Sequence, residues 1–459
     1  DYQTTCIDHI LETKIIDKRG TVYFQLSTGL GKCHGIDTPI IMYDGSIKMV
    51  QDIRVGDILM GDNSTPRNVL SLARGQDMLY EIIPTKGEKY IVNQEHILCL
   101  RYSPNKSIRD NRQESAYQVI WFDNIKIKVK TKFFAYNSIN QKEVHKKAVE
   151  FLDKIDEDKI VEIPVKHYLK LSKTMQTHLK GYRTAINFPT KKVPFDPYML
   201  GYWLGDGGSR DTRITSQDST VLHHFAHNLG KYNLHLRYIV DYSYYITGYN
   251  GKVGSNIMLT TLKRYNLLRN KHIPNIYKCN SEEIRLQVLA GLLDSDGSLV
   301  NDGCTFEIIQ KSEQLIDDII YLCRSLGFAC YKSKQAKGCW YKGEYKSDYY
   351  YRIAISGNTD KIPTLCPRKK ANCRRQIKDV LMTGIKVNSI GDGNYYGFTL
   401  DGNGRFVLGS HMVTHNTTMG NYLSSYLGLK TAVLCHLDIV NKQWVKEFQT
   451  HSTAKVQRV

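Results

Sequence analysis

Two distant points of the chain carry side chains that could break and rejoin a peptide bond. Cys33 has a thiol, whose thiolate attacks carbonyl carbon readily at neutral pH. Near the other end, His415, Asn416 and Thr417 bring together an imidazole, a side-chain amide and a hydroxyl. The thiol and the hydroxyl can each take an acyl group, the Asn416 amide can attack its own backbone carbonyl, and a histidine can protonate the nitrogen that leaves. These residues predict acyl transfer at both ends of segment 33–416.

The flanks of this segment read as two halves of a phosphate-binding loop. Gly29, Gly31 and Lys32 have the usual spacing, but the hydroxyl residue that should follow the lysine and bind Mg²⁺ is missing. Thr417 supplies it if segment 33–416 is removed and Lys32 is joined to Thr417. A chance glycine loop is the alternative, but chance does not explain why the missing threonine follows a His-Asn pair.

The joined flanks, 1–32 and 417–459, resemble the start of a superfamily-two helicase. This resemblance implies a host protein that binds ATP after splicing, through the loop residues Gly29, Gly31, Lys32 and Thr417.

The segment between the flanks resembles the intein family at both of its ends. Residues 37–57 resemble the first intein block, and residues 88–96 resemble the block that supplies a histidine, here His96, beside the first scissile bond. The family usually has Thr three residues before that histidine. This chain has Asn93, which can still form hydrogen bonds.

The C-terminal intein block is matched by residues 395–400 and 405–416. Two further polar residues of the family are not evident there, because Gly397 and Gly404 lie near their positions. The resemblance implies an all-β Hint splicing domain formed by residues 33–100 and 388–416, with no cofactor. The catalytic residues it implies are Cys33, Asn93, His96, His415, Asn416 and Thr417.

A duplicated motif lies in the middle of the chain. Residues 199–207 and 289–297 align so that Asp206 matches Asp296, and each motif has small residues spaced for one helix face. Asp196-Pro197 predicts the start of the first helix, and Asn280 with Glu283 predicts a capping box for the second. Two close helices would hold both acids together, where they repel unless a cation such as Mg²⁺ neutralises them.

This motif pair resembles the LAGLIDADG homing endonuclease family over about residues 186–387. The resemblance implies an α+β domain of two pseudo-symmetric αββαββα halves that cleaves double-stranded DNA, with Asp206 and Asp296 as metal ligands and catalytic residues. Lys271 and Lys369 match the family's catalytic-lysine blocks, although Lys370 could take the place of Lys369. The implied target is the host gene without the insertion.

Residues 101–185 alternate lysines with aromatic residues. This pattern suits contacts to a nucleic-acid backbone, and it resembles the additional DNA-recognition segment of some inteins. A solvated connector would have the same composition. The sequence leaves these two interpretations open.

Composition is consistent with a DNA-binding, multi-domain protein. The chain has 459 residues and 63 Lys+Arg against 45 Asp+Glu, a net charge of +18 that favours a polyanionic partner. The 11 cysteines have no zinc-site spacing and fit a reducing compartment, cytoplasm or nucleus. No apolar run predicts a membrane span, and Asp1 suggests an internal segment of a longer protein. The rival functions are a splicing element with an inactive nuclease, an ATP-dependent helicase fragment and a DNA-binding module.

Overall fold

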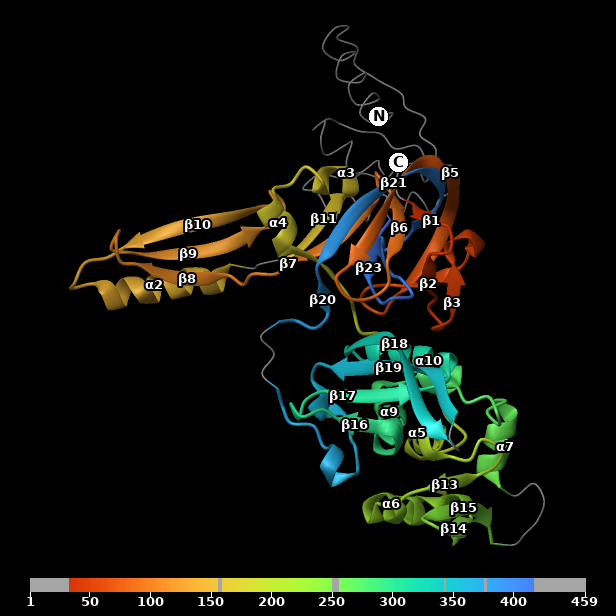
Figure 1. Cartoon of the computed structure of the whole chain (residues 1–459). Coiled ribbons are helices and arrows are strands. Elements are labelled where there is room, and N and C mark those ends of the chain that lie inside the picture. Colours follow the sequence, from red (N-terminus) through yellow and green to blue (C-terminus); the bar gives the residue numbers. More distant parts are fainter. Residues whose placement is uncertain (1–32, 156–158, 250–255, 342–343, 375–377, 417–459) are drawn as a thin grey trace, which may run out of the picture.

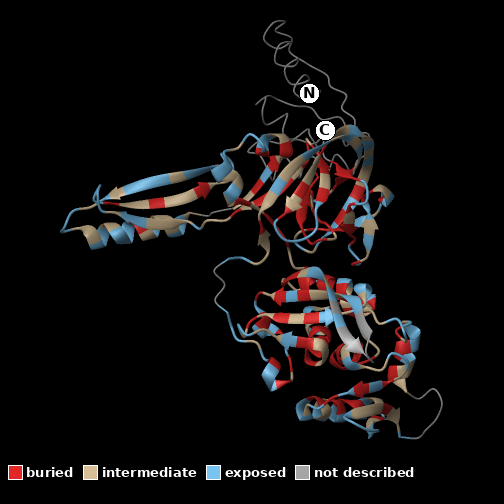
Figure 2. Cartoon of the chain, viewed as in Figure 1, coloured by how far each residue is buried: buried red, intermediate tan, exposed pale blue. Residues whose placement is uncertain are grey.

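The computed structural model describes residues 33–416 except 156–158, 250–255, 342–343 and 375–377. Figure 1 shows three parts: a β body that contains both ends of the described chain, an arm that projects from its side, and an α/β body below it. Figure 2 shows buried residues throughout the two bodies, whereas the arm is mostly exposed or half-buried. Within the described residues, no helix is long and apolar enough to span a membrane.

The β body consists of residues 33–102, 160–185 and 382–416. Its strands are β1 (His34–Gly35), β2 (Pro39–Ile41), β3 (Ile47–Met49), β4 (Ile58–Met60), β5 (Pro66–Pro84), β6 (Tyr90–Asn93), β7 (Ile97–Tyr102), β11 (Ile160–Pro164), β12 (Leu179–Tyr182), β20 (Met382–Thr383), β21 (Ile385–Leu400), β22 (Arg405–Val407) and β23 (Val413–His415). Short helices η1 (Val50–Asp52), α3 (Val165–Tyr168) and α4 (Lys173–His178) complete it.

Strands from both ends of the segment share the sheets of the β body. One sheet has the order β21-β1-β6-β5-β4, and another has the order β20-β12-β7-β23-β22 with β11 also on β7. Alternating apolar residues of these strands, among them Ile40, Ile82, Phe398 and Phe406, fill one core. The first and last residues of the segment are therefore held in one domain.

The predicted boundaries of the splicing domain are wrong in two places. β11 and β12 both pair with β7, so residues 160–182 belong to the β body and not to a separate segment 101–185. β21 begins at Ile385, before the predicted boundary at 388, and pairs with β5 along its length. The sequence misled here because strand pairing is a long-range property that local composition does not report.

The arm is a three-stranded sheet covered on one face by a helix. It contains β8 (Ser107–Asn111), β9 (Ala116–Asp123), β10 (Lys128–Ala135) and α2 (Gln141–Lys154). The ring of Phe151 in α2 packs on Trp121 and Phe134 of the sheet. Phe122 stacks on Tyr102 of β7 with ring centroids 4.0 Å apart, which attaches the arm to the β body.

The α/β body contains two halves of similar element order. The first half is α5 (Pro197–Asp206), β13 (Arg213–Thr215), α6 (Ser219–Leu229), η2 (Gly230–Tyr232), β14 (Leu234–Tyr238), β15 (Ser243–Gly248), α7 (Ile257–Arg264) and α8 (Asn275–Lys278). The second half is α9 (Glu282–Asp296), β16 (Gly297–Leu299), β17 (Phe306–Gln310), α10 (Glu313–Ser325), β18 (Ala329–Tyr341), β19 (Glu344–Ser356), η3 (Thr359–Lys361) and η4 (Pro367–Lys369).

The predicted α+β architecture of two pseudo-symmetric halves is confirmed, except that the first half has one strand fewer than the second. Strand β16 of the second half is matched in the first half only by an isolated bridge between Gly207 and Ile214. The first sheet therefore has the order β13-β15-β14 and the second has the order β16-β17-β19-β18.

The starts of α5 and α9 test two local predictions. Asp196 caps α5 as predicted, because its Oδ1 accepts from the backbone N–H of Met199 at 2.9 Å. The capping box predicted at Asn280 is wrong: Ser281 is the N-cap of α9. The Asn280 side chain instead accepts from the backbone N–H of Lys191. It thereby joins the start of α9 to the linker between β12 and α5.

The β body and the α/β body are in direct contact. Arg324 of α10 forms two hydrogen bonds to the carboxylate of Glu88, at 2.8 and 2.9 Å. The hydroxyl of Tyr321, also in α10, donates to the carbonyl of Gly45 at 3.0 Å. These contacts place α10 against the turns of the β body.

Candidate functional site

Cys33 lies at the start of the β body and is held by Asn93. The thiol-bearing residue is fully buried, and its backbone N–H donates to Asn93 Oδ1 at 3.0 Å. In return, the backbone N–H of Asn93 donates to the Cys33 carbonyl at 3.1 Å. Asn93 at the usual threonine position thus makes a hydrogen bond to the nitrogen of the first predicted scissile bond.

His96 connects this end of the segment to the other. Its ring is fully buried, and its Nε2 is 2.6 Å from Thr414 Oγ1 in β23. The ring of His34 packs edge-on against it with centroids 4.5 Å apart. Burial lowers the pKa of His34 to about 3, so its imidazole is neutral at pH 7. Neither His34 nor Thr414 was predicted as part of the site, although both are adjacent in sequence to predicted residues.

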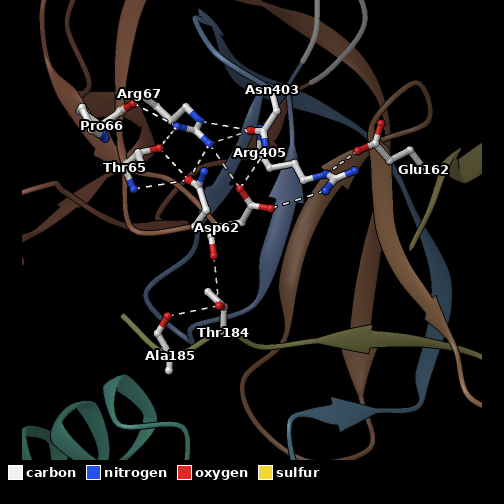
Figure 3. A network of polar contacts seen from close by, with 10 residues as sticks. Asp62, Thr65, Pro66, Arg67, Glu162, Thr184, Ala185, Asn403 and Arg405 are labelled. Atoms are coloured by element: carbon white, nitrogen blue, oxygen red, sulfur yellow. Dashed lines mark hydrogen bonds and ion pairs between the residues drawn. The ribbon is translucent and has the colours of Figure 1, made fainter. Parts of the chain in front are cut away.

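His415 faces a carboxylate that the sequence analysis missed. Its Nε2 is 3.5 Å from Glu162 Oε2, and Glu162 belongs to β11. Arg405 donates through Nε to Glu162 Oε1 at 2.6 Å, and its Nη1 is 3.5 Å from Asp62 Oδ2. Figure 3 shows that this network continues to Arg67, which holds the turn before β5. No local signal marks Glu162, because the contact depends on the pairing of β11 with β7.

Gly404 makes room for the last residue of the described chain. The backbone N–H of Asn416 donates to the Gly404 carbonyl at 2.8 Å. A Cβ at Gly404, where φ is +71°, would lie 2.5 Å from the Asn416 carbonyl oxygen and 3.1 Å from the His415 ring. Both the positive φ and the close approach require glycine. Among the described residues, the buried Nδ2 of Asn416 has no hydrogen-bond partner.

A second candidate site lies where α5 and α9 end together. The two helices touch through their glycines: a Cβ on Gly201 would lie 2.9 Å from the Val288 carbonyl carbon, and one on Gly291 would lie 2.5 Å from the Tyr202 backbone nitrogen. This contact brings Asp206 and Asp296, the last residues of the two helices, next to each other.

Burial and mutual repulsion disfavour two charged carboxylates at this point. Burial is the main cause that raises the pKa of Asp296 to about 6, and the charge of Asp206 adds to it. Burial also raises the pKa of Asp206, against the opposing effect of Lys369 and Lys271. Gln310 of β17 is hydrogen-bonded to Asp296 Oδ2. A shared cation would relieve the repulsion, so the donor set suits a hard divalent metal.

Each predicted lysine lies beside one of the two helix ends. Lys271 Nζ donates to the carbonyls of Gly205 and Gly207, both at 2.8 Å, and burial lowers its pKa to about 8. Lys369 Nζ donates to three carbonyls at the end of α9, the shortest to Asp294 at 2.7 Å. Lys370 is exposed, so Lys369 is the lysine that reaches the site.

Asp294 has a structural role that the duplicated motif did not predict. Its buried carboxylate accepts from the hydroxyl of Tyr198 at 2.8 Å and from the backbone N–H groups of Leu365 and Cys366 at 2.6 and 3.3 Å. These bonds hold the loop that carries Lys369. The matching position in the first motif is Leu204, so the two halves differ here.

The predicted phosphate-loop residues Gly29, Gly31, Lys32 and Thr417 lie outside the described residues, as do the two flanks 1–32 and 417–459.

Comparisons with known proteins find similarity to a helicase and to an endonuclease. The chain is 32% identical over 155 residues to the replicative DNA helicase DnaB of Mycobacterium intracellulare, covering 34% of this chain and 23% of that protein. It is 24% identical over 254 residues to the homothallic switching endonuclease of Saccharomyces cerevisiae, covering 48% and 43% of the two chains. This chain spans less than half the length of either relative.

Solved structures with similarity include an intein and a protein in complex with DNA. The structure of I-DmoI in complex with DNA and Ca is matched over 38% of this chain and 95% of that chain, at 13% identity and a TM-score of 0.26. The gp41-1 intein is matched over 24% of this chain and 91% of that chain, at 12% identity and a TM-score of 0.14.

The family profile described as Hom_end-associated Hint matches residues 33–415, which is most of the chain. It confirms the predicted resemblance to inteins and the predicted Hint fold. The chain belongs to the Hom_end-associated Hint family.

Proposed function

We propose that this chain excises residues 33–416, joins Lys32 to Thr417, and cleaves double-stranded DNA with the α/β body. The observation that carries the splicing proposal is the hydrogen bond between His96 and Thr414. It connects the block that holds Cys33 to β23, the strand that directly precedes Asn416, so residues near both proposed splice junctions share one buried site.

The reaction follows from the chemistry of the terminal residues. Cys33 Sγ attacks the carbonyl carbon of Lys32, the bond to the Cys33 nitrogen breaks, and the thiol proton ends on that nitrogen. The Thr417 hydroxyl then takes the acyl group and the Cys33 thiol is released. Asn416 Nδ2 attacks its own backbone carbonyl, closes a succinimide and frees the Thr417 amine. That amine attacks the ester carbonyl, which leaves Lys32 joined to Thr417 by a peptide bond.

Two histidines are suited to the proton transfers. His96 is within the block that holds the Cys33 nitrogen, and His415 is adjacent to the cyclising Asn416. The Glu162 carboxylate, 3.5 Å from His415 Nε2, would stabilise positive charge that develops on the ring during proton transfer. No cofactor is required for any of these steps.

The splicing proposal is tested by the intact mass of the purified chain over time. The wild-type chain should yield a free 33–416 fragment and joined flanks, while the Cys33→Ala, Asn416→Ala double variant should stay whole. A wild-type chain that stays whole under reducing conditions would refute the proposal.

The paired carboxylates carry the proposal of DNA cleavage. Mg²⁺ held by Asp206 and Asp296 would polarise the phosphate and lower the pKa of a bound water. Lys271 and Lys369 each bring a cation to one side of the site, where it can stabilise negative charge on a phosphate. The basic surplus of the chain favours the same partner.

A plasmid carrying the host gene without the insertion tests this proposal. The Cys33→Ala, Asn416→Ala chain should linearise it with Mg²⁺ and not with EDTA, and Asp206→Asn or Asp296→Asn should abolish cleavage. Binding without cleavage would support the rival interpretation, a splicing element with an inactive nuclease. ATP binding by the host is proposed only for the joined flanks, and it is tested by ATPase activity before and after excision.

A further inference from the structure

Asp77 lies behind Asn93 on the side away from Cys33. It belongs to β5, and its Oδ2 accepts from Asn93 Nδ2 at 2.9 Å. Its Oδ1 accepts from the backbone N–H of Met78 at 2.8 Å and from Gln94 Nε2 at 3.3 Å. Asp77, Asn93 and Cys33 thus form a continuous chain of hydrogen bonds that ends at the nitrogen of the first scissile bond.

This chain of bonds decides which way the Asn93 amide faces. An asparagine side chain has an oxygen that accepts and a nitrogen that donates, and either could point at Cys33. An ionised carboxylate only accepts, so Asp77 requires the Asn93 nitrogen on its own side. The Asn93 oxygen must then face the Cys33 N–H, as observed at 3.0 Å.

We infer that Asp77 is a positioning residue for the first splicing step: it orients the Asn93 amide that holds the Cys33 nitrogen. The inference rests on the proposed splicing reaction. In that step the Cys33 nitrogen leaves the Lys32 carbonyl carbon and gains the proton that the thiol loses. Holding its N–H toward Asn93 fixes the nitrogen while Sγ attacks. The negative charge of Asp77 also polarises the amide, which makes its oxygen a stronger acceptor.

The residue at position 93 explains why such a partner is needed. A threonine hydroxyl rotates and can accept from the Cys33 N–H without help. An asparagine amide has two unlike ends, and a reversed amide would turn its own N–H groups toward the Cys33 N–H. Asp77 removes that alternative, so the function of Asp77 depends on Asn93.

A double-variant experiment in the Asn416→Ala chain tests this dependence. That chain cannot cyclise, and dithiothreitol cleaves it at the bond before Cys33 by attacking the thioester, so the rate of release of residues 1–32 reports the first step. Asp77→Asn should lower this rate by about tenfold, the loss expected for one charge-assisted hydrogen bond. Asp392→Asn is the matched control, because Asp392 is an exposed acid on the adjacent strand opposite Met78; it should leave the rate unchanged.

The decisive comparison adds Asn93→Thr. In a chain with threonine at position 93, Asp77→Asn should have no further effect, because the hydroxyl needs no orienting partner. Cleavage after Asn416, measured separately in the Cys33→Ala chain, should be unchanged by Asp77→Asn and shows that the domain is folded.

Three results would overturn the inference. They are an unchanged thiol cleavage rate in Asp77→Asn, an equal loss with threonine at position 93, and an equal slowing of cleavage at both ends. If thiol does not cleave even the parent Asn416→Ala chain, the proposed splicing reaction fails as well. A cleaved parent separates that failure from failure of the inference alone.

Discussion

Gly201→Ala puts a methyl group into the closest contact between helices α5 and α9. The added Cβ would lie 2.9 Å from the Val288 carbonyl carbon and closer still to its oxygen. Ordinary carbon contacts need about 3.5 Å, so the backbones must separate by at least about 0.6 Å. Backbone cannot rotate away as a side chain can, and both helix ends must move with it.

Gly201→Ala should lower the rate of DNA cleavage much more than it lowers the stability of the domain. Overpacking lowers the free energy of unfolding by about 1–3 kcal/mol, and the higher helix propensity of alanine offsets up to about 1 kcal/mol of this loss. The domain should therefore fold. Asp206 and Asp296 would move apart, and a displacement approaching 1 Å at reacting groups lowers rates by about 100-fold.

Plasmid linearisation with Mg²⁺ and thermal unfolding should be measured on the same samples, in the Cys33→Ala, Asn416→Ala chain. Gly230→Ala is the matched control, since a Cβ there would meet nothing within 4 Å, and it should cleave at the parent rate. In the chain that is able to splice, Gly201→Ala should leave splicing unchanged. Full cleavage activity in Gly201→Ala would refute the claim that this contact sets the spacing of the two acids.

Three further predictions concern contacts that the structure provides. Glu162→Gln removes the carboxylate facing His415 and should slow cleavage after Asn416 about tenfold, measured by mass in the Cys33→Ala chain; an unchanged rate would exclude a role for this pair. Asp294→Asn loosens the loop of Lys369 in one half only, so nicked plasmid should accumulate before linear product on a gel, and equal slowing of both strands would contradict this. In the folded chain the pKa of His34 is about 3, so its ring is neutral, whereas in the unfolded chain the ring takes up a proton below about pH 6.5. The free energy of unfolding should therefore decrease as the pH falls below 6.5, by about 2 kcal/mol at pH 5. Denaturant unfolding of the Cys33→Ala, Asn416→Ala chain should show this loss, and His34→Phe should reduce it by about the contribution of His34. A smaller slope of the same sign should remain, because burial also lowers the pKa of His411.

Local chemistry explains what the sequence could predict. The Cys33 thiol, the Asn416 amide and the two acids in repeated motifs are recognised by residue type and position, so their proposed roles could be read from the sequence. The glycine spacing in the repeated motifs predicted a close helix contact because small residues on one helix face have that consequence wherever two helices cross. The Asp196 cap was predictable for the same reason, since a cap is decided within one helical turn.

Long-range pairing explains what the sequence could not predict. Glu162 reaches His415 only because β11 lies on β7, and Asp77 reaches Asn93 only because β5 lies beside β6. Neither residue is in a recognisable motif. The Asn280 prediction failed for a related reason: its side chain has a partner in the linker at Lys191, so the adjacent Ser281 serves as the cap.

Both insertions into the β body begin and end at paired strands. The α/β body leaves from β12 and returns at β20, which pair through Gly181↔Thr383 and Tyr182↔Met382. The arm leaves after β7 and returns at β11, which pair through Arg101↔Ile160. An insertion whose two ends are already neighbours costs the sheet little, because the closure entropy of a long loop grows only slowly with its length.

Because of this strand pairing, residues 103–159 can be removed without loss of a strand from the β body, whereas residues 101–185 cannot. Replacing residues 103–159 by a short turn would keep β11, and with it the Glu162 carboxylate beside His415. Removing the whole of 101–185, the segment that composition alone set apart, would delete β11 and β12 from the sheet. We expect splicing to survive the first deletion and to fail in the second, with intact mass as the readout. Equal splicing by both chains would show that neither strand is needed at the C-terminal junction.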